Sequence, residues 1–261
     1  MTRDVCLSVE SVSKTFKTRG NSILAVSNVD LVLHAGEFLS IVGPSGCGKS
    51  TLLNMMAGIE EVTSGKIVIA DSAPGSLGYV TQRDSLLPWR SLLSNVELGL
   101  ELRGTPAPER HETVREWLRL VGLEGFEEHF PDQLSGGMRQ RASLVRTLAY
   151  GPKLLLLDEP FGALDAQTRV SLQTELLALW ARAAVPAILV THDIGEAICL
   201  SDRIILMSPR PGQIAGEYLV PLPRPRPSPI ELWKTDEFRQ LSDRLWADLS
   251  KVAGERGFGR D

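Results

Sequence analysis

Residues 38–58, FLSIVGPSGCGKSTLLNMMAG, contain the clearest change of pattern in the chain. The first five residues are mostly apolar, which is typical of a short strand buried on both faces. After a glycine-rich loop, apolar residues recur at spacings of three and four, which predicts a helix that begins at Lys49 and stops at Gly58. The stretch therefore predicts a strand–loop–helix unit and favours an α/β fold.

The loop between this strand and helix fits the phosphate-binding pattern G-x-x-x-x-G-K-[ST]. Glycines let successive N–H groups turn inward around phosphate oxygens, and the helix start adds a partial positive charge. In this pattern Lys49 reaches the β- and γ-phosphates, and the Ser50 hydroxyl holds Mg²⁺. The alternative is a glycine-rich turn that binds nothing. We expect an ATP site that includes Gly43, Pro44, Ser45, Gly46, Cys47, Gly48, Lys49, Ser50 and Thr51.

Cys47 occupies a free position of the pattern, so no catalytic role is required of it. A nucleophilic cysteine needs a partner base, and no histidine lies nearby in the sequence. We expect the loop amides and Lys49 to lower the pKa of its thiol and make it reactive.

Length and composition are those of an ordinary globular protein: 261 residues, 43% of them hydrophobic, with a net charge of −4. This mild acidity argues against sequence-general nucleic-acid binding. The three cysteines form no CxxC pair, which fits a reducing compartment. The sequence shows neither a signal peptide nor the roughly 18 apolar residues of a membrane span, so we expect a cytosolic chain.

Further strands and helices alternate along the chain. Short apolar runs predict strands at 65–70, 76–80, 152–160, 186–193 and 203–210. A helical region lies within them at about 89–150. We expect an ATPase domain over 1–220 that includes this helical subdomain, and a separate segment over 221–261. The latter starts with PLPRPRPSP, which favours an extended segment over a packed element, and ends in a short helix through Phe238 and Leu249.

Two acidic residues follow the leucines at 154–157. Ligands of open α/β sheets bind at the carboxyl ends of strands. Asp158 is therefore placed to hold Mg²⁺, and Glu159 to activate the water that attacks a phosphate. The alternative is a pair of exposed carboxylates before the turn at Pro160.

Two further polar residues also follow predicted strands. His192 comes after 186–191 and is a candidate contact to the γ-phosphate or the attacking water. Its alternative is a histidine satisfied by backbone groups. Gln82 follows 76–80 and is a candidate ligand of Mg²⁺ or water, although a lone glutamine is usually a surface residue.

A second glycine-rich helix start lies at LSGGMRQR, residues 134–141. Ser135 is a good N-cap, and apolar positions from Met138 to Ala149 predict the helix that follows. Gly136 and Gly137 then fall in its first turn, where bare N–H groups and the helix dipole attract phosphate. A second cradle in one chain suggests that two copies share each nucleotide.

These motifs, in this order, resemble the ATPase subunits of ABC transporters over residues 7–220. LSGGMRQR is similar to the signature motif of that family, whose sites form across a head-to-tail dimer. The resemblance implies that Phe16 stacks on adenine, that Gln82 is the Q-loop glutamine, that GALD (Gly162–Asp165) is the D-loop and that His192 is the switch histidine. It implies a P-loop NTPase fold with a mostly parallel RecA-like sheet, an antiparallel β-subdomain and a helical signature subdomain.

Several segments, among them SPRPGQI at 208–214, resemble the importers of nitrate, aliphatic sulfonates and taurine. The expected partners are a second copy, membrane permease subunits and, indirectly, a solute-binding protein, at the cytoplasmic face of the membrane. Leu86–Trp89 is the candidate groove for the permease, and its alternative is packing inside the helical region. A soluble ABC ATPase and an exporter subunit remain the alternative functions. The solute is not encoded in this subunit.

Overall fold

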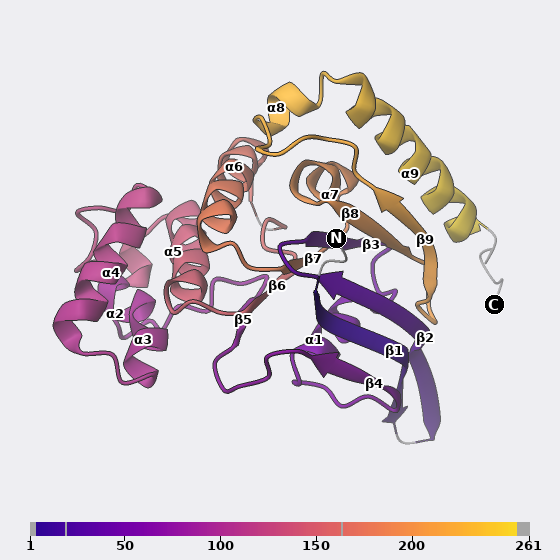
Figure 1. Ribbon diagram of the computed structural model, residues 1–261, viewed down its shortest axis with the longest axis horizontal. Helices are drawn as coiled ribbons and strands as arrows, with labels where there is room; N and C mark the ends of the chain where they lie inside the picture. Colours follow the sequence, from indigo (N-terminus) through magenta and orange to yellow (C-terminus); the bar gives the residue numbers. More distant parts are fainter. Residues whose placement is uncertain (1–3, 19, 163, 255–261) are drawn as a thin grey trace. The chain divides into compact units, whose positions relative to one another are not determined.

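The computed structural model describes residues 4–18, 20–162 and 164–254. The chain divides into two compact units, Met1–Ser72 with Pro186–Asp261 (unit 1) and Ala73–Val185 (unit 2). Figure 1 follows the chain through the elements of each unit.

Unit 1 contains a three-stranded antiparallel sheet in the order β2-β1-β4, as the resemblance implied. Along β2, every second residue from Leu31 to Leu33 is buried, which is the pattern of a sheet with one face on the core. The strands are β1 (Val5–Thr18), β2 (Asn21–His34) and β4 (Ser64–Ile69).

The parallel strands of unit 1 lie around β3 (Phe38–Val42), which pairs in parallel with β7 (Ala187–Thr191) and β8 (Arg203–Met207). All residues of β3 and β7 are buried, as the continuous apolar runs predicted. An edge strand, β9 (Ile214–Leu219), pairs antiparallel with β8. Helix α1 (Lys49–Met56) follows β3, and α7 (Ile194–Leu200) follows β7.

The end of the chain differs from the prediction. Helix α9 (Asp236–Gly254) has 19 residues and is not short, and a preceding turn forms α8 (Pro229–Leu232). Residues 221–228 lie in no helix or strand, as predicted, and Pro229 is the first residue of α8. The segment is nevertheless held against the rest of unit 1: Arg224 and Arg226 both lie against Asp202, and the side chain of Arg226 is only 1% exposed. The prolines exclude regular hydrogen bonding, but these two arginines attach the segment to the core.

Unit 2 contains the parallel pair β5 (Leu77–Val80) and β6 (Leu154–Asp158) and all the helices of the predicted helical region. In α4, Val114, Trp117 and Leu118 are buried, as their spacing predicted. The helices are α2 (Leu92–Val96), α3 (Leu98–Leu102), α4 (Ala107–Leu120), α5 (Gly136–Ala149) and α6 (Ala166–Ala183), with a 3₁₀ turn at Pro131–Gln133. Throughout the described parts of both units, every helix is too short or too polar to cross a membrane.

Candidate functional site

The loop between β3 and α1 is shaped for glycine. Gly48 caps α1 with a left-handed φ of 110°. A Cβ on Gly48 would lie 2.9 Å from the carbonyl oxygen of Ala25, and one on Gly43 would lie 2.8 Å from that of Met207. Both contacts are too close for any side chain, so the glycine spacing follows from packing against neighbouring backbone.

Lys49 is buried within this loop and is only 4% exposed. Its ammonium donates to the carbonyl oxygens of Gly43 (2.8 Å) and Pro44 (3.0 Å). A lysine ammonium beside a glycine-rich helix start suits the binding of an anion.

Cys47 corrects a prediction. Its side chain is 1% exposed, and burial raises the pKa of its thiol, while the charges of Lys49 and Arg210 oppose the rise without cancelling it. The prediction of a lowered thiol pKa and a reactive thiolate is therefore wrong. Removal from water disfavours the charged form of the thiol more than the nearby cations favour it.

His192 lies at the same edge of the unit 1 sheet as the phosphate loop. Val42 pairs with Thr191, so the carboxyl ends of β3 and β7 are level and the loop and His192 follow neighbouring strands. The turn at His192 is held by Asp193, whose backbone N–H donates to Thr191 Oγ1 and whose side chain caps α7. These bonds hold the backbone of the turn from which the exposed His192 side chain projects.

Phe16 lies on β1 of the antiparallel sheet and is half-buried. The ammonium of Lys14 lies over its ring, 4.9 Å from the centroid. The same ammonium donates to Glu61 O and pairs with Glu60, so Lys14 fixes the environment of one aromatic face.

In unit 2, Gln82 and Glu159 converge. Val80 pairs with Leu157, so the two residues leave neighbouring strands at the same end. A Cβ on Gly162 would lie 3.4 Å from Gln82 Nε2 and 3.7 Å from Glu159 Oε2. Glu159 has a φ of 44°, a left-handed conformation that costs free energy for a residue with a side chain and that clusters at functional sites.

Asp158 ends β6 and accepts a hydrogen bond from the hydroxyl of Tyr79, with 3.4 Å between the oxygens. Burial and the charge of Asp158 raise the pKa of Tyr79, so its hydroxyl stays protonated and acts as a donor. Sequence reasoning missed Tyr79. The available signal was its place two residues before Thr81, on the same strand that leads to Gln82.

The predicted helix start at LSGGMRQR is confirmed. Ser135 caps α5, and its hydroxyl oxygen accepts from Met138 N at 3.3 Å. Gly136 and Gly137 occupy the first turn. A Cβ on Gly136 would meet nothing closer than Arg139 at 4.0 Å, so this position is open, whereas a Cβ on Gly137 would lie 3.0 Å from Thr168 Cγ2.

The predicted D-loop, Gly162–Asp165, is described only in part, because Ala163 lies outside the described residues. Asp165 caps α6 by accepting from the N–H groups of Gln167 and Thr168. A hydrogen bond from the Thr168 side chain, together with these N–H groups, lowers the pKa of its carboxyl.

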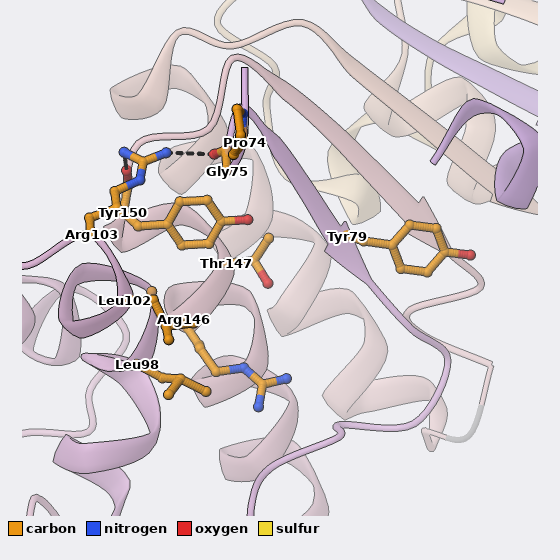
Figure 2. A pocket seen from close by; sticks show the side chains of 10 residues that line it. Pro74, Gly75, Tyr79, Leu98, Leu102, Arg103, Arg146, Thr147 and Tyr150 are labelled. Carbon is orange, nitrogen blue, oxygen red and sulfur yellow. Dashed lines mark hydrogen bonds between the residues drawn. The ribbon is translucent and has the colours of Figure 1, made fainter. Parts of the chain in front are cut away.

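A cavity of about 450 Å³ lies within unit 2, and Figure 2 shows its lining. Its walls come from β5, α3, α5 and the turn at Pro74–Gly75, and its exposed surface is mostly apolar. Tyr150 donates to Leu77 O at 2.8 Å, and Arg103 donates to Gly75 O, so both side chains are anchored at the rim.

The predicted Mg²⁺ ligands Ser50, Gln82 and Asp158 all offer oxygen, which suits this hard cation. The described parts of the chain contain no group of three His, Cys, Asp or Glu side chains that would hold a metal without help. Mg²⁺ commonly binds through one or two carboxylates together with substrate phosphates. The donor set and the glycine cradle before Ser50 therefore fit a metal that arrives with a nucleotide.

Known proteins are similar to this chain in sequence and fold. The family model described as ABC transporter matches residues 26–162. The taurine import ATP-binding protein TauB of Burkholderia pseudomallei is 43% identical over 81% of this chain and 83% of its own length. The nitrate import ATP-binding protein NrtD of Synechocystis sp. is 39% identical over 92% and 93%. The solved dimeric ATP-binding cassette MJ0796, in a post-hydrolysis state with ADP and Pi, is 34% identical with a TM-score of 0.72, over 82% of this chain and 98% of that one. The chain therefore belongs to the ABC transporter family.

Proposed function

We propose that this chain is the ATP-hydrolysing subunit of an ABC importer and that its nucleotide sites form between two copies. The observation that carries the proposal is the presence of two glycine-rich helix starts in one chain. One precedes α1 and contains the buried Lys49, and the other opens α5 at Ser135. A site formed within one chain needs only one such cradle. The dimeric cassette MJ0796, which was solved with ADP and Pi, supports the shared arrangement.

In the proposed site, the loop amides and Lys49 bind the β- and γ-phosphates, and Phe16 stacks on adenine. Ser50, Gln82 and Asp158 hold Mg²⁺, which neutralises charge on the phosphates. The remaining contacts to the γ-phosphate come from the partner copy, through the turn at Ser135.

Glu159 is the proposed general base. As the oxygen of water bonds to the γ-phosphorus, the bond from that phosphorus to ADP breaks and the water proton passes to the Glu159 carboxylate. His192 contacts the γ-phosphate. Gln82 converges with Glu159 at Gly162 and responds to loss of this phosphate. Hydrolysis thus removes the group that joins the two copies.

Membrane permease subunits are the proposed partners, and they hold the chain at the cytoplasmic face of the membrane. Trp89 is 71% exposed, so it does not pack inside the helical region, whereas Leu86 is 8% exposed and does. Tryptophan is enriched at protein interfaces, because it combines a large apolar surface with a polar N–H group. The apolar cavity beside α3 and α5 is the second proposed contact, because it is large enough for side chains of a permease loop.

The proposed solute is a small anion or zwitterion, because TauB is named for taurine import and NrtD for nitrate import. The solute itself contacts the permease and a solute-binding protein, not this subunit. Its identity is therefore a property of those partners.

Glu159→Gln tests the shared site. The amide keeps the shape of the side chain but cannot accept the water proton, so we expect turnover to fall by roughly 10²–10⁴-fold with ATP binding retained. ATP and Mg²⁺ should then trap the variant as a dimer, seen by light scattering, while the wild type hydrolyses ATP and dissociates. If the isolated variant dimerises too weakly to be detected, the same assay is run on its complex with the permease. Failure of two copies of the variant to associate in that complex, with ATP and Mg²⁺ present, would refute the shared site.

A further inference from the structure

Tyr79 lines the cavity and touches the proposed magnesium ligand. On β5 the burial alternates, and Tyr79 is on the less buried face. Tyr79 is one of the residues that line the cavity, together with Tyr150 and Leu98. Figure 2 shows that its ring and hydroxyl point away from the other lining side chains. The hydroxyl is therefore directed toward other groups than the cavity lining.

The strand register brings the hydroxyl to Asp158. Tyr79 pairs with Leu156 on the parallel strand β6, so Asp158 lies two residues further along, toward the carboxyl end. The side chain of Tyr79 reaches across that distance, and its hydroxyl donates to Asp158 Oδ2 at 3.4 Å. This is longer than the usual separation of about 2.7–2.8 Å between hydroxyl donor and oxygen acceptor. The two groups are nevertheless within hydrogen-bonding reach, so the hydroxyl favours one orientation of the carboxylate.

We propose that Tyr79 is a positioning residue that orients Asp158 for Mg²⁺. The inference rests on the proposed function, because it needs Asp158 to be a metal ligand. Residues that hydrogen-bond to metal ligands set the orientation of those ligands and tune metal affinity.

Tyr79→Phe removes the hydroxyl and keeps the cavity wall. Mn²⁺, a spectroscopic substitute for Mg²⁺, is titrated into the full chain with a stoichiometric non-hydrolysable ATP analogue and followed by electron paramagnetic resonance. We expect the half-saturating Mn²⁺ concentration to rise roughly tenfold, the lower end for outer partners of metal ligands. Binding of the analogue in EDTA and the unfolding temperature should not change. Tyr79→His keeps a ring and a donor and should restore part of the affinity.

Tyr150→Phe is the matched control, because its hydroxyl borders the same cavity but donates to Leu77 O and not to Asp158. It should leave Mn²⁺ binding unchanged. Equal shifts in both variants, or no shift in Tyr79→Phe, would overturn the inference. If Tyr79→Phe does not fold, Tyr79→His is compared with the wild type instead. An unaltered unfolding temperature together with less than half of the wild-type affinity for Mn²⁺ would then decide against the inference. A wild-type chain that binds neither analogue nor Mn²⁺ would instead refute the proposed function, and the inference with it.

Discussion

The two glycine-rich helix starts of this chain differ in what makes glycine necessary. At the start of α1, a Cβ on Gly48 would approach the Ala25 carbonyl to 2.9 Å, and its φ of 110° is disfavoured for other residues. At the start of α5, a Cβ on Gly136 would meet only the end of the Arg139 side chain, at 4.0 Å. The chain's own packing therefore requires glycine at the first site and not at Gly136.

This difference supports a role for Gly136 outside the isolated chain. Glycine in a helix costs roughly 1 kcal/mol relative to alanine. No close contact within the chain requires glycine at position 136 to offset this cost. Under the shared-site proposal, the open turn leaves room for the nucleotide of a second copy. The predictions below test this contrast, from the largest expected effect to the smallest.

Gly48→Ala should damage both stability and nucleotide binding. The new Cβ clashes with the backbone and makes the left-handed φ of this residue unfavourable, so we expect the free energy of unfolding to fall by roughly 2–4 kcal/mol. Urea unfolding measures this loss. Binding of a fluorescent ATP analogue should disappear. Gly58→Ala is the control: its φ is 71° with open space around it, so only the backbone cost of about 1–2 kcal/mol applies. Equal losses at both positions would show that the close approach is unimportant.

Gly136→Asp should leave the isolated chain folded but disable the dimer. A carboxylate in the first turn interacts favourably with the helix dipole, so the free energy of unfolding should stay equal or rise by about 0.3–1 kcal/mol. The same charge repels the phosphates of the partner's ATP. We expect intact ATP binding and loss of the ATP-dependent dimer, measured in the Glu159→Gln background.

Gly136→Asn separates the effect of charge from that of size, because asparagine has nearly the same shape as aspartate but carries no charge. It should weaken the dimer less than Gly136→Asp does. If Gly136→Asp instead dimerises normally, the open turn at α5 does not face a phosphate.

The Cys47 thiol should be protected by the tight loop before α1. With a chromogenic disulfide reagent at neutral pH, we expect Cys6, which is only half-buried, to react first, and Cys47 and Cys199 to react only after unfolding in urea. Burial raises the pKa of all three thiols, that of Cys199 to about 12.

The pH dependence of stability follows with a definite sign. A thiol whose pKa is raised by folding stays neutral in the folded chain and ionises first in the unfolded one. The free energy of unfolding should therefore fall slightly as pH rises above the ordinary thiol pKa of about 8.5, and less so in Cys47→Ser. Rapid modification of Cys47 in the folded chain would contradict the burial that the structure shows.

Much of the fold was predictable from local pattern. The buried strands β3, β6 and β7 are continuous apolar runs, and α5 begins at the predicted Ser135 cap. The tail was harder, because a proline-rich sequence gives no sign of the buried contacts that Arg226 makes with Asp202 and nearby carbonyls. The length of α9 was also underestimated, since its apolar positions continue past the residues that first marked it.

The sequence by itself determined the family and the candidate residues, because phosphate and metal chemistry demand particular residue types at fixed short spacings. Gly43–Ser50, Asp158–Glu159 and Ser135–Gly137 are such local sets. Only the tertiary structure decided the state of Cys47, the strained backbone of Glu159 and the contact from Tyr79 to Asp158. Each depends on groups from separate segments that meet only after folding: burial sets the charge of a thiol, and strand register decides which carboxylate a tyrosine can reach.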